Sequence, residues 1–185
     1  MSTLTTSRPL TLGRPAGVVL FAAAVAAASQ IAIPLPWTPV PITLQPMLVI
    51  LAGMMLGPVA GASSMLLYLA AGAAGLPVFT PIGAPGIARF FGPTGGYLLA
   101  YPLAAFTTGV LAVRPSPFAR RVRAGIAGIA VIYVGGIAVL SLLNGSIVRA
   151  IQLGVTPFAA LDIVKAFIAA GISAPSLRIG ARSNR

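Results

Sequence analysis

Long apolar runs, separated by short segments rich in proline, glycine or arginine, dominate this chain of 185 residues. No Asp, Glu, Lys, Arg or His occurs between Pro15 and Ala88. Such runs are typical of membrane-spanning helices, because a charged side chain at the centre of a membrane helix costs roughly 2.5–3.5 kcal/mol. The pattern predicts six helices, over residues 16–33, 43–56, 59–74, 96–113, 124–143 and 157–177.

The second and third runs are compatible with two helices or with one kinked helix, because Gly57-Pro58 separates them and the second run is short. Its 14 residues would span about 21 Å, less than the ~30 Å hydrocarbon core. The arginines favour two helices, since inner segments carry most of the positive charge. With both termini inside, six helices place nine arginines inside and two outside, whereas five helices reach at best seven and four. The inside set is Arg8, Arg14, Arg114, Arg120, Arg121, Arg123, Arg178, Arg182 and Arg185, and the outside set is Arg89 and Arg149.

The connecting segments differ in character. Residues 34–45 contain four prolines and are predicted to be extended. Residues 75–95 form a long connection, rich in glycine and proline, whose phenylalanines argue against disorder. We expect residues 120–123 in an inner loop and residues 144–156 in a polar outer loop, with Pro157 in the first turn of the last helix.

The composition supports a membrane class. The chain is 58% hydrophobic with a mean hydropathy of +1.01, and 7% of its residues are charged, against about a quarter in soluble domains. We therefore predict an all-α polytopic membrane protein, with one integral membrane domain over residues 1–185 and cytoplasmic ends at 1–15 and 178–185. The start also resembles a signal peptide that ends near Ala28, but a long run followed by further spans favours a retained helix.

The net charge of +11 raises the question of a nucleic-acid partner. The arginines lie at the ends of apolar runs rather than along one face, and no aromatic RNA-binding stretch accompanies them. Flanking arginine is what the positive-inside rule produces. The sequence therefore predicts that the chain lies in the lipid bilayer of the cell (plasma) membrane, with both termini in the cytoplasm. It predicts no nucleic-acid partner.

Catalytic chemistry is poorly supported. With no His, no Cys and one carboxylate, the chain lacks a Ser-His-Asp set, a carboxylate pair and a metal cluster. A Ser-Lys dyad is formally open, although nothing places a serine beside Lys165. No Walker A motif is present, because Val164 precedes the only lysine. We predict no enzyme, no metal and no cofactor in this chain; uphill transport would draw on an ion gradient or another subunit.

One pair of ionisable residues lies inside an apolar run. Asp162, the only acidic residue, and Lys165, the only lysine, are three apart and so share a helical face. An intramembrane ionisable pair marks a functional site or a structural ion pair that locks helices. With Arg89, which alternatively is a solvated loop residue, the pair would suit a small anionic molecule with N–H donors.

Small residues recur at a spacing of four in the first apolar run. This spacing permits close helix approach, either within the chain or against another membrane subunit. The pairs are Ala22/Ala26, Ala23/Ala27 and Ala24/Ala28.

Four motifs, in order, resemble the BioY family, the biotin-specific substrate-binding (S) components of energy-coupling factor (ECF) transporters. They are PVPITLQ (39–45), LLYLAAGAAGLPVF (66–79), GPTGGYL (92–98) and Asp162-x-x-Lys165, and the resemblance covers about residues 30–170. It implies a six-helix S-component fold and high-affinity capture of biotin from outside. It also implies partners: a transmembrane coupling subunit, which would meet the alanine motif at 22–28, and ABC-type ATPase subunits that use ATP.

The resemblance further implies a binding site formed by Asp162, Lys165 and Arg89. In this hypothesis Asp162 accepts a ureido N–H of biotin, Lys165 donates to the ureido oxygen, and Arg89 pairs with the carboxylate. Tyr97 and Phe79 are candidates to line the apolar part of the ligand. Alternatives are an S component for another vitamin, an autonomous ion-coupled carrier of a small anionic solute, and a scaffold in which the charged pair only locks helices.

Overall fold

Helices make up most of the residues that the structure, a computed structural model, describes, which are residues 13–174. The predicted cytoplasmic end 178–185 and most of the end at 1–15 lie outside these residues. The helices are α1 (Arg14–Gln30), α2 (Gln45–Leu56), α3 (Pro58–Ala73), α4 (Gly95–Leu111), α5 (Phe118–Asn144), α6 (Ile147–Gly154) and α7 (Ala159–Ile172), with a 3-10 helix η1 (Gly86–Phe91). The strands β1 (Ile33–Leu35) and β2 (Thr38–Ile42) form an antiparallel hairpin in the segment predicted to be extended.

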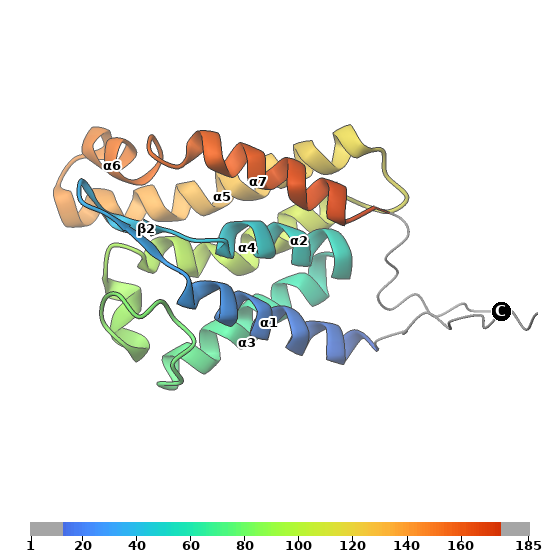
Figure 1. The fold of residues 1–185 in the computed structure, drawn as a ribbon, viewed down its shortest axis with the longest axis horizontal. Coiled ribbons are helices and arrows are strands. Elements are labelled where there is room, and N and C mark those ends of the chain that lie inside the picture. Colours follow the sequence, from blue (N-terminus) through green and yellow to red (C-terminus); the bar gives the residue numbers. More distant parts are fainter. Residues whose placement is uncertain (1–12, 175–185) are drawn as a thin grey trace, which may run out of the picture.

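The long helices run back and forth between two ends of the molecule (Figure 1). One end, here the hairpin end, holds the β1–β2 hairpin, residues 75–94 and α6. The other, here the arginine end, holds the α2–α3 turn and residues 112–117, which lead into the arginines of the first turns of α5. Helix α4 packs against α2, α3 and α5, while α7 packs against α2 and α5. The helices α2, α4, α5 and α7 therefore surround one interior.

Proline and glycine set the boundaries of the first helices. Pro15, Pro46 and Pro58 occupy the first or second position of α1, α2 and α3, where a missing N–H costs no intrahelical hydrogen bond. Gly57 separates α2 from α3 with a φ of 83°, a conformation that favours glycine. The two runs around Gly57 are thus two helices, as the arginine distribution predicts.

Most helices are shorter than a single membrane crossing requires. Among the described residues, α5 alone is long and apolar enough to cross a membrane as a single straight helix. Helices α6 and α7 meet the same criterion together, but a bend of 55° separates them. The apolar helices α1 to α4 have 12–17 residues. The structure confirms a mostly helical fold with membrane-type helices, and the six crossings stay a prediction.

Several predicted boundaries are wrong. The first helix ends at Gln30 rather than at 33, and the last ends at Ile172 rather than at 177. Helix α5 begins at Phe118 rather than at 124, so Arg120–Arg123 are helical; charge is tolerated there because it lies at a helix end. The predicted loop at 144–156 contains α6, whose N-terminus is capped by the Ser146 hydroxyl, which accepts from the Arg149 N–H at 3.3 Å. Helix α7 begins at Ala159, and Pro157 lies in the turn before it.

Candidate functional site

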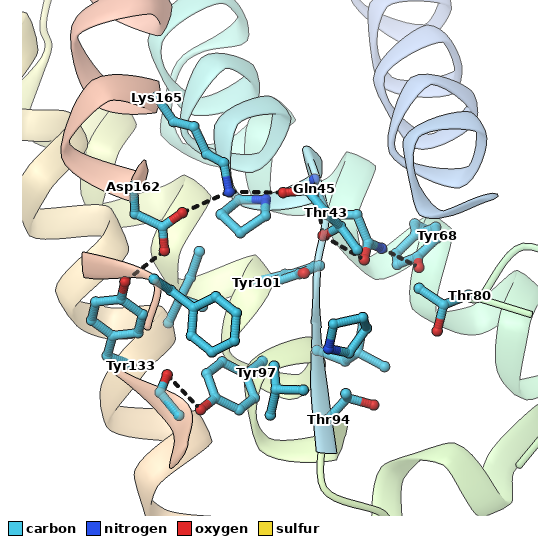
Figure 2. Close-up of a pocket in the computed structure, with 17 residues that line it drawn as sticks. Thr43, Gln45, Tyr68, Thr80, Thr94, Tyr97, Tyr101, Tyr133, Asp162 and Lys165 are labelled. Atoms are coloured by element: carbon cyan, nitrogen blue, oxygen red, sulfur yellow. Dashed lines mark hydrogen bonds and ion pairs between the residues drawn. The ribbon is translucent and has the colours of Figure 1, made fainter. Parts of the chain in front are cut away.

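A cavity lies toward the hairpin end, between β2 and the helices α2, α4, α5 and α7 (Figure 2). The cavity has a volume of about 60 Å³, well below the roughly 300–1,000 Å³ of ligand pockets. The cavity is narrow as it stands, so a larger ligand requires a wall to move. Its polar lining consists of Thr43, Gln45, Tyr68, Thr80, Thr94, Tyr97, Tyr101, Tyr133, Asp162 and Lys165.

The charged pair of α7 lines this cavity. Asp162 and Lys165 are each 4% exposed, and Lys165 Nζ lies 2.7 Å from Asp162 Oδ1. Lys165 Nζ also donates to the Thr43 carbonyl oxygen at 2.8 Å, which connects α7 to the segment before α2. The predicted pairing on one helical face is therefore confirmed, and the charges lie beside open space as well as beside each other.

Two tyrosine hydroxyls complete this side of the cavity. Tyr133, on α5, donates to Asp162 Oδ2 at 2.6 Å, and Tyr97, on α4, donates to the Gly154 carbonyl oxygen at 2.9 Å. A Cβ at Gly154 would overlap the Tyr97 hydroxyl, so glycine permits this close approach. Tyr97 lines the cavity, and its contact with a ligand stays a prediction. Tyr133 was missed; its only signal in the sequence is a hydroxyl in the middle of an apolar helix.

A second polar pair lies on the opposite side (Figure 2). Gln45 Nε2 donates to the Tyr68 hydroxyl at 2.7 Å, and both residues are buried. The Tyr68 ring stacks on Tyr101, with 6.5 Å between ring centroids. Gln45 and Tyr68 were also missed as site residues, although both fall within the motifs that suggested the BioY family. The cavity thus has hydrogen-bonding groups at two sides and aromatic surface between them.

Arg89 lies behind the cavity wall rather than in it. Its guanidinium donates to the Thr80 hydroxyl at 3.1 Å and to the carbonyl oxygens of Thr80 and Ile82. Thr80 lines the cavity and Arg89 does not. Burial lowers the pKa of Arg89 from its ordinary value. Its Nε is a buried side-chain nitrogen with no hydrogen-bond partner in the described part of the chain. The structure therefore brings Arg89 close to the site through Thr80, without direct access to the open space.

Phe79, which was expected to line the ligand, does not line the cavity. Phe79 packs edge-on against Tyr68 and Phe90, with ring centroids 5.4 and 5.7 Å away, and it is not a lining residue. Its ring surface is covered by these two aromatic neighbours instead. Phe79 supports Tyr68 from behind.

The six alanines at positions 22–28 of α1 do not share one environment. Ala23 and Ala27, four residues apart, are exposed on the outside of the helix. Ala22 and Ala28 are buried, and Ala24 and Ala26 are half-buried. The set thus divides between internal packing and an outward face of small residues.

Known proteins of one family resemble this chain along most of its length. The family model described as the BioY family matches residues 2–182. The biotin transporter BioY of Thermotoga maritima is 39% identical over 154 residues, which cover 83% of this chain and 89% of the relative. A probable biotin transporter BioY of Pyrococcus horikoshii is 42% identical over 149 residues, covering 80% and 86%.

A solved structure is similar along most of its length. It is the crystal structure at 2.1 Å of the S-component for biotin from an ECF-type ABC transporter. The TM-score is 0.78 at 29% identity, and the match covers 86% of this chain and 88% of that chain. Because the family model matches nearly the whole sequence and the relatives align over most of it, this chain belongs to the BioY family.

Proposed function

We propose that this chain captures biotin at the outer face of the cell membrane, as the S component of an ECF-type transporter. Family membership and the transporter names of the relatives support a transport role rather than an enzymatic one. One observation carries the proposal: the buried Asp162–Lys165 pair lines a cavity in which tyrosine rings provide apolar surface. Such a site suits a small ligand with a polar head and an apolar body.

The two sides of the cavity fit the two ends of biotin. Asp162 would accept a ureido N–H, and Lys165 would donate to the ureido oxygen. The ring system would lie on Tyr97, and the chain would point its carboxylate toward Thr80. Behind Thr80, the Arg89 guanidinium supplies positive charge, and its unpartnered Nε has capacity for one further hydrogen bond. A small shift of residues 80–89 would bring Arg89 to the carboxylate.

Entry of a ligand of this size requires the narrow cavity to widen. Two of the segments around the cavity, the hairpin and residues 75–94, contain no long helix. The hairpin is tied to the end of α6 by a hydrogen bond from the Thr38 hydroxyl to the Leu153 carbonyl oxygen, at 2.6 Å. We propose that these segments open to admit biotin and close over it, excluding water from the hydrogen bonds to the head.

The proposed orientation places the hairpin end outside and both termini in the cytoplasm. Six crossings then put nine of the eleven arginines on the inner side. The short helix α2 can be accommodated because its neighbours shelter it: six consecutive residues, 49–54, are buried. The bent pair α6–α7 would act as an interfacial helix followed by the last crossing.

Partners are part of the proposal. The outward face of Ala23 and Ala27 on α1 would pack against a transmembrane coupling subunit, since small residues let helices approach closely. ABC-type ATPase subunits would supply the ATP hydrolysis for which this chain has no Walker motif. Ala23→Leu should then weaken assembly with the coupling subunit, measured by co-purification, while biotin binding by the isolated chain stays unchanged.

Calorimetric titration of the purified chain in detergent tests the ligand. We expect saturable binding of biotin at one site and no binding of pantothenate, an anionic vitamin without a urea ring. Absence of biotin binding would contradict the proposal. Uptake into vesicles, with and without the ATPase partners, then distinguishes an S component from an autonomous ion-coupled carrier, which would concentrate biotin without them.

A further inference from the structure

Helix α6 has three faces, and the protein covers only one of them. Ala150 and Gly154 are buried, on the side where α6 packs against α5 and β2. The second face is polar and exposed, and it holds Arg149 and Gln152. The third face is apolar and also exposed; its members are Ile147 (63% exposed), Val148 (65%) and Ile151 (41%). An exposed apolar face beside an exposed polar face suits the boundary between lipid and water.

The position of α6 along the molecule agrees with such a boundary. The part of α5 from Arg123, its last charged residue, to Asn144, at its end, is about 32 Å long at the helical rise of 1.5 Å per residue. This length is close to the ~30 Å of the hydrocarbon core. Helix α6 follows directly and is inclined by 55° to α7. It therefore begins where the hydrocarbon core ends.

The hairpin brings an aromatic side chain to the same region. The hydrogen bond from the Thr38 hydroxyl to the Leu153 carbonyl oxygen, at 2.6 Å, holds the hairpin beside the end of α6 (Figure 1). Trp37, the only tryptophan of the chain, precedes Thr38 and is 63% exposed. Tryptophan is enriched at the interface between membrane and water. Two separate segments thus present interfacial side chains at the hairpin end.

Arg149 has no anionic partner in the described part of the chain. Asp162 is the only acidic residue, and Lys165 and Tyr133 already contact both of its oxygens. Within residues 13–174, the Arg149 guanidinium has no hydrogen bond or ion pair. A guanidinium presents its N–H donors in a planar fork that matches the oxygens of a phosphate. An exposed arginine beside an apolar face therefore complements a phospholipid, which joins a phosphate to acyl chains.

We propose that Trp37 and α6 form a binding surface for an anionic phospholipid at the outer boundary of the bilayer. The apolar face of α6 contacts the acyl chains, Trp37 lies at the level of the headgroups, and Arg149 pairs with the phosphate. Only the membrane orientation is taken from the proposed function, and no contact with biotin is assumed.

The test of the lipid contact uses single-tryptophan variants of the full chain in phosphatidylcholine vesicles. Part of the lipid carries bromine along its acyl chains, which quenches tryptophan fluorescence on contact. In a Trp37→Phe background, Val148→Trp reports on the apolar face and Gln152→Trp, the matched control, on the polar face. We expect Val148→Trp to be quenched several-fold more strongly than Gln152→Trp, because the apolar face of an interfacial helix lies among the acyl chains.

The preference for an anionic headgroup tests Arg149. From the quenching of Val148→Trp, brominated phosphatidylglycerol should bind about fivefold more tightly than brominated phosphatidylcholine. Arg149→Gln should bring this ratio close to one. The matched control is Arg123→Gln, because Arg123 is exposed near the other end of α5 and should leave the ratio at Val148→Trp unchanged.

Several results would overturn the assignment. Equal quenching of Val148→Trp and Gln152→Trp would exclude the lipid contact, and weak quenching of both is what a second protein chain covering α6 would give. A headgroup preference that survives Arg149→Gln would remove the phosphate contact. If Val148→Trp does not fold, Ile147→Trp reports on the same face. Biotin titration of the same vesicles is a separate readout: absence of biotin binding contradicts the proposed function alone, whereas absence of lipid quenching contradicts only the lipid site.

Discussion

The arginine end and the cavity toward the hairpin end each have a buried cation, Arg121 and Lys165, and the two cations meet different partners. Arg121, 8% exposed, donates from Nε to the Ala170 carbonyl oxygen at 2.9 Å and from Nη1 to that of Ser116 at 2.6 Å. Lys165 is buried as deeply, yet it contacts a carboxylate and borders a cavity. Arg121 thus connects the end of α7 to the loop before α5, while Lys165 faces open space.

The difference shows that burial of a charge does not by itself mark a binding site. The last carbonyl groups of a helix have no intrahelical partner, and cations near them are stabilising. Arg121 meets this need at α7, as Arg120 does for the Leu111 carbonyl oxygen at the end of α4, at 2.8 Å. A cation that keeps a free N–H donor beside a cavity can bind a ligand, whereas a cation whose donors pair with carbonyl oxygens stabilises the fold.

Asp162→Asn should have the largest effect on the hairpin end. The change removes the charge that accepts from Lys165 and Tyr133, and with it the proposed acceptor for the ligand. We expect the affinity for biotin to fall by at least about 100-fold, since hydrogen bonds to charged groups are the strong ones. Calorimetric titration measures this, with a thermal melt to confirm folding. Affinity within threefold of the wild type would assign the pair to bracing α7 alone.

Arg121→Met should affect stability and leave binding unchanged. Two buried carbonyl oxygens lose their donor, which lowers the free energy of unfolding by about 2–3 kcal/mol and the melting temperature by roughly 4–12 °C. The matched control is Arg123→Met, because Arg123 is exposed in the same first turns of α5. A biotin affinity that changes along with the melting temperature would remove the distinction between the two ends.

Arg89→Ala tests whether the 75–94 segment contributes a ligand-binding side chain. If Arg89 reaches the ligand carboxylate, biotin should lose roughly tenfold in affinity while the neutral biotin amide loses less. If Arg89 acts only by holding Thr80 and Ile82, both ligands should lose equally. Titration of one variant with both ligands therefore decides whether Arg89 binds the carboxylate or only orders the wall.

Of the three changes in or behind the cavity wall, Gly154→Ala should have the smallest effect on biotin affinity. A Cβ there would overlap the Tyr97 hydroxyl and push the ring toward the cavity. We expect affinity for biotin to fall by roughly three- to tenfold, because one neutral hydrogen bond is lost. Gly171→Ala is the matched control on α7, where a Cβ would meet nothing within 4 Å. Equal affinities for the two variants would show that the position of Tyr97 does not matter.

The fold could be predicted where local chemistry decides it. Proline at helix starts and Gly57 between two apolar runs give α1, α2 and α3 from the sequence. Helix α6 was missed because it is short and because its polar residues, such as Arg149 and Gln152, resemble a loop. The start of α5 was missed because charged residues were taken to end the helix, although they lie at the membrane boundary in the proposed orientation.

The site could be predicted only where its residues are close in sequence. Asp162 and Lys165 are three apart on one helix, so their contact follows from helical geometry. The contact of Tyr133 with Asp162 joins α5 to α7 across 29 positions, and no spacing rule gives it. The split of the α1 alanines into buried and exposed members likewise depends on how α1 packs against α2 and α3.

The most direct measurement compares Lys165→Met with Arg121→Met in a thermal melt, with and without biotin. A ligand that binds the folded state raises the melting temperature according to its concentration relative to Kd. We expect saturating biotin to raise the melting temperature of the wild type and of Arg121→Met by the same amount, and to leave that of Lys165→Met unchanged. A full biotin-induced rise in Lys165→Met would contradict the assignment of the hairpin end as the binding site.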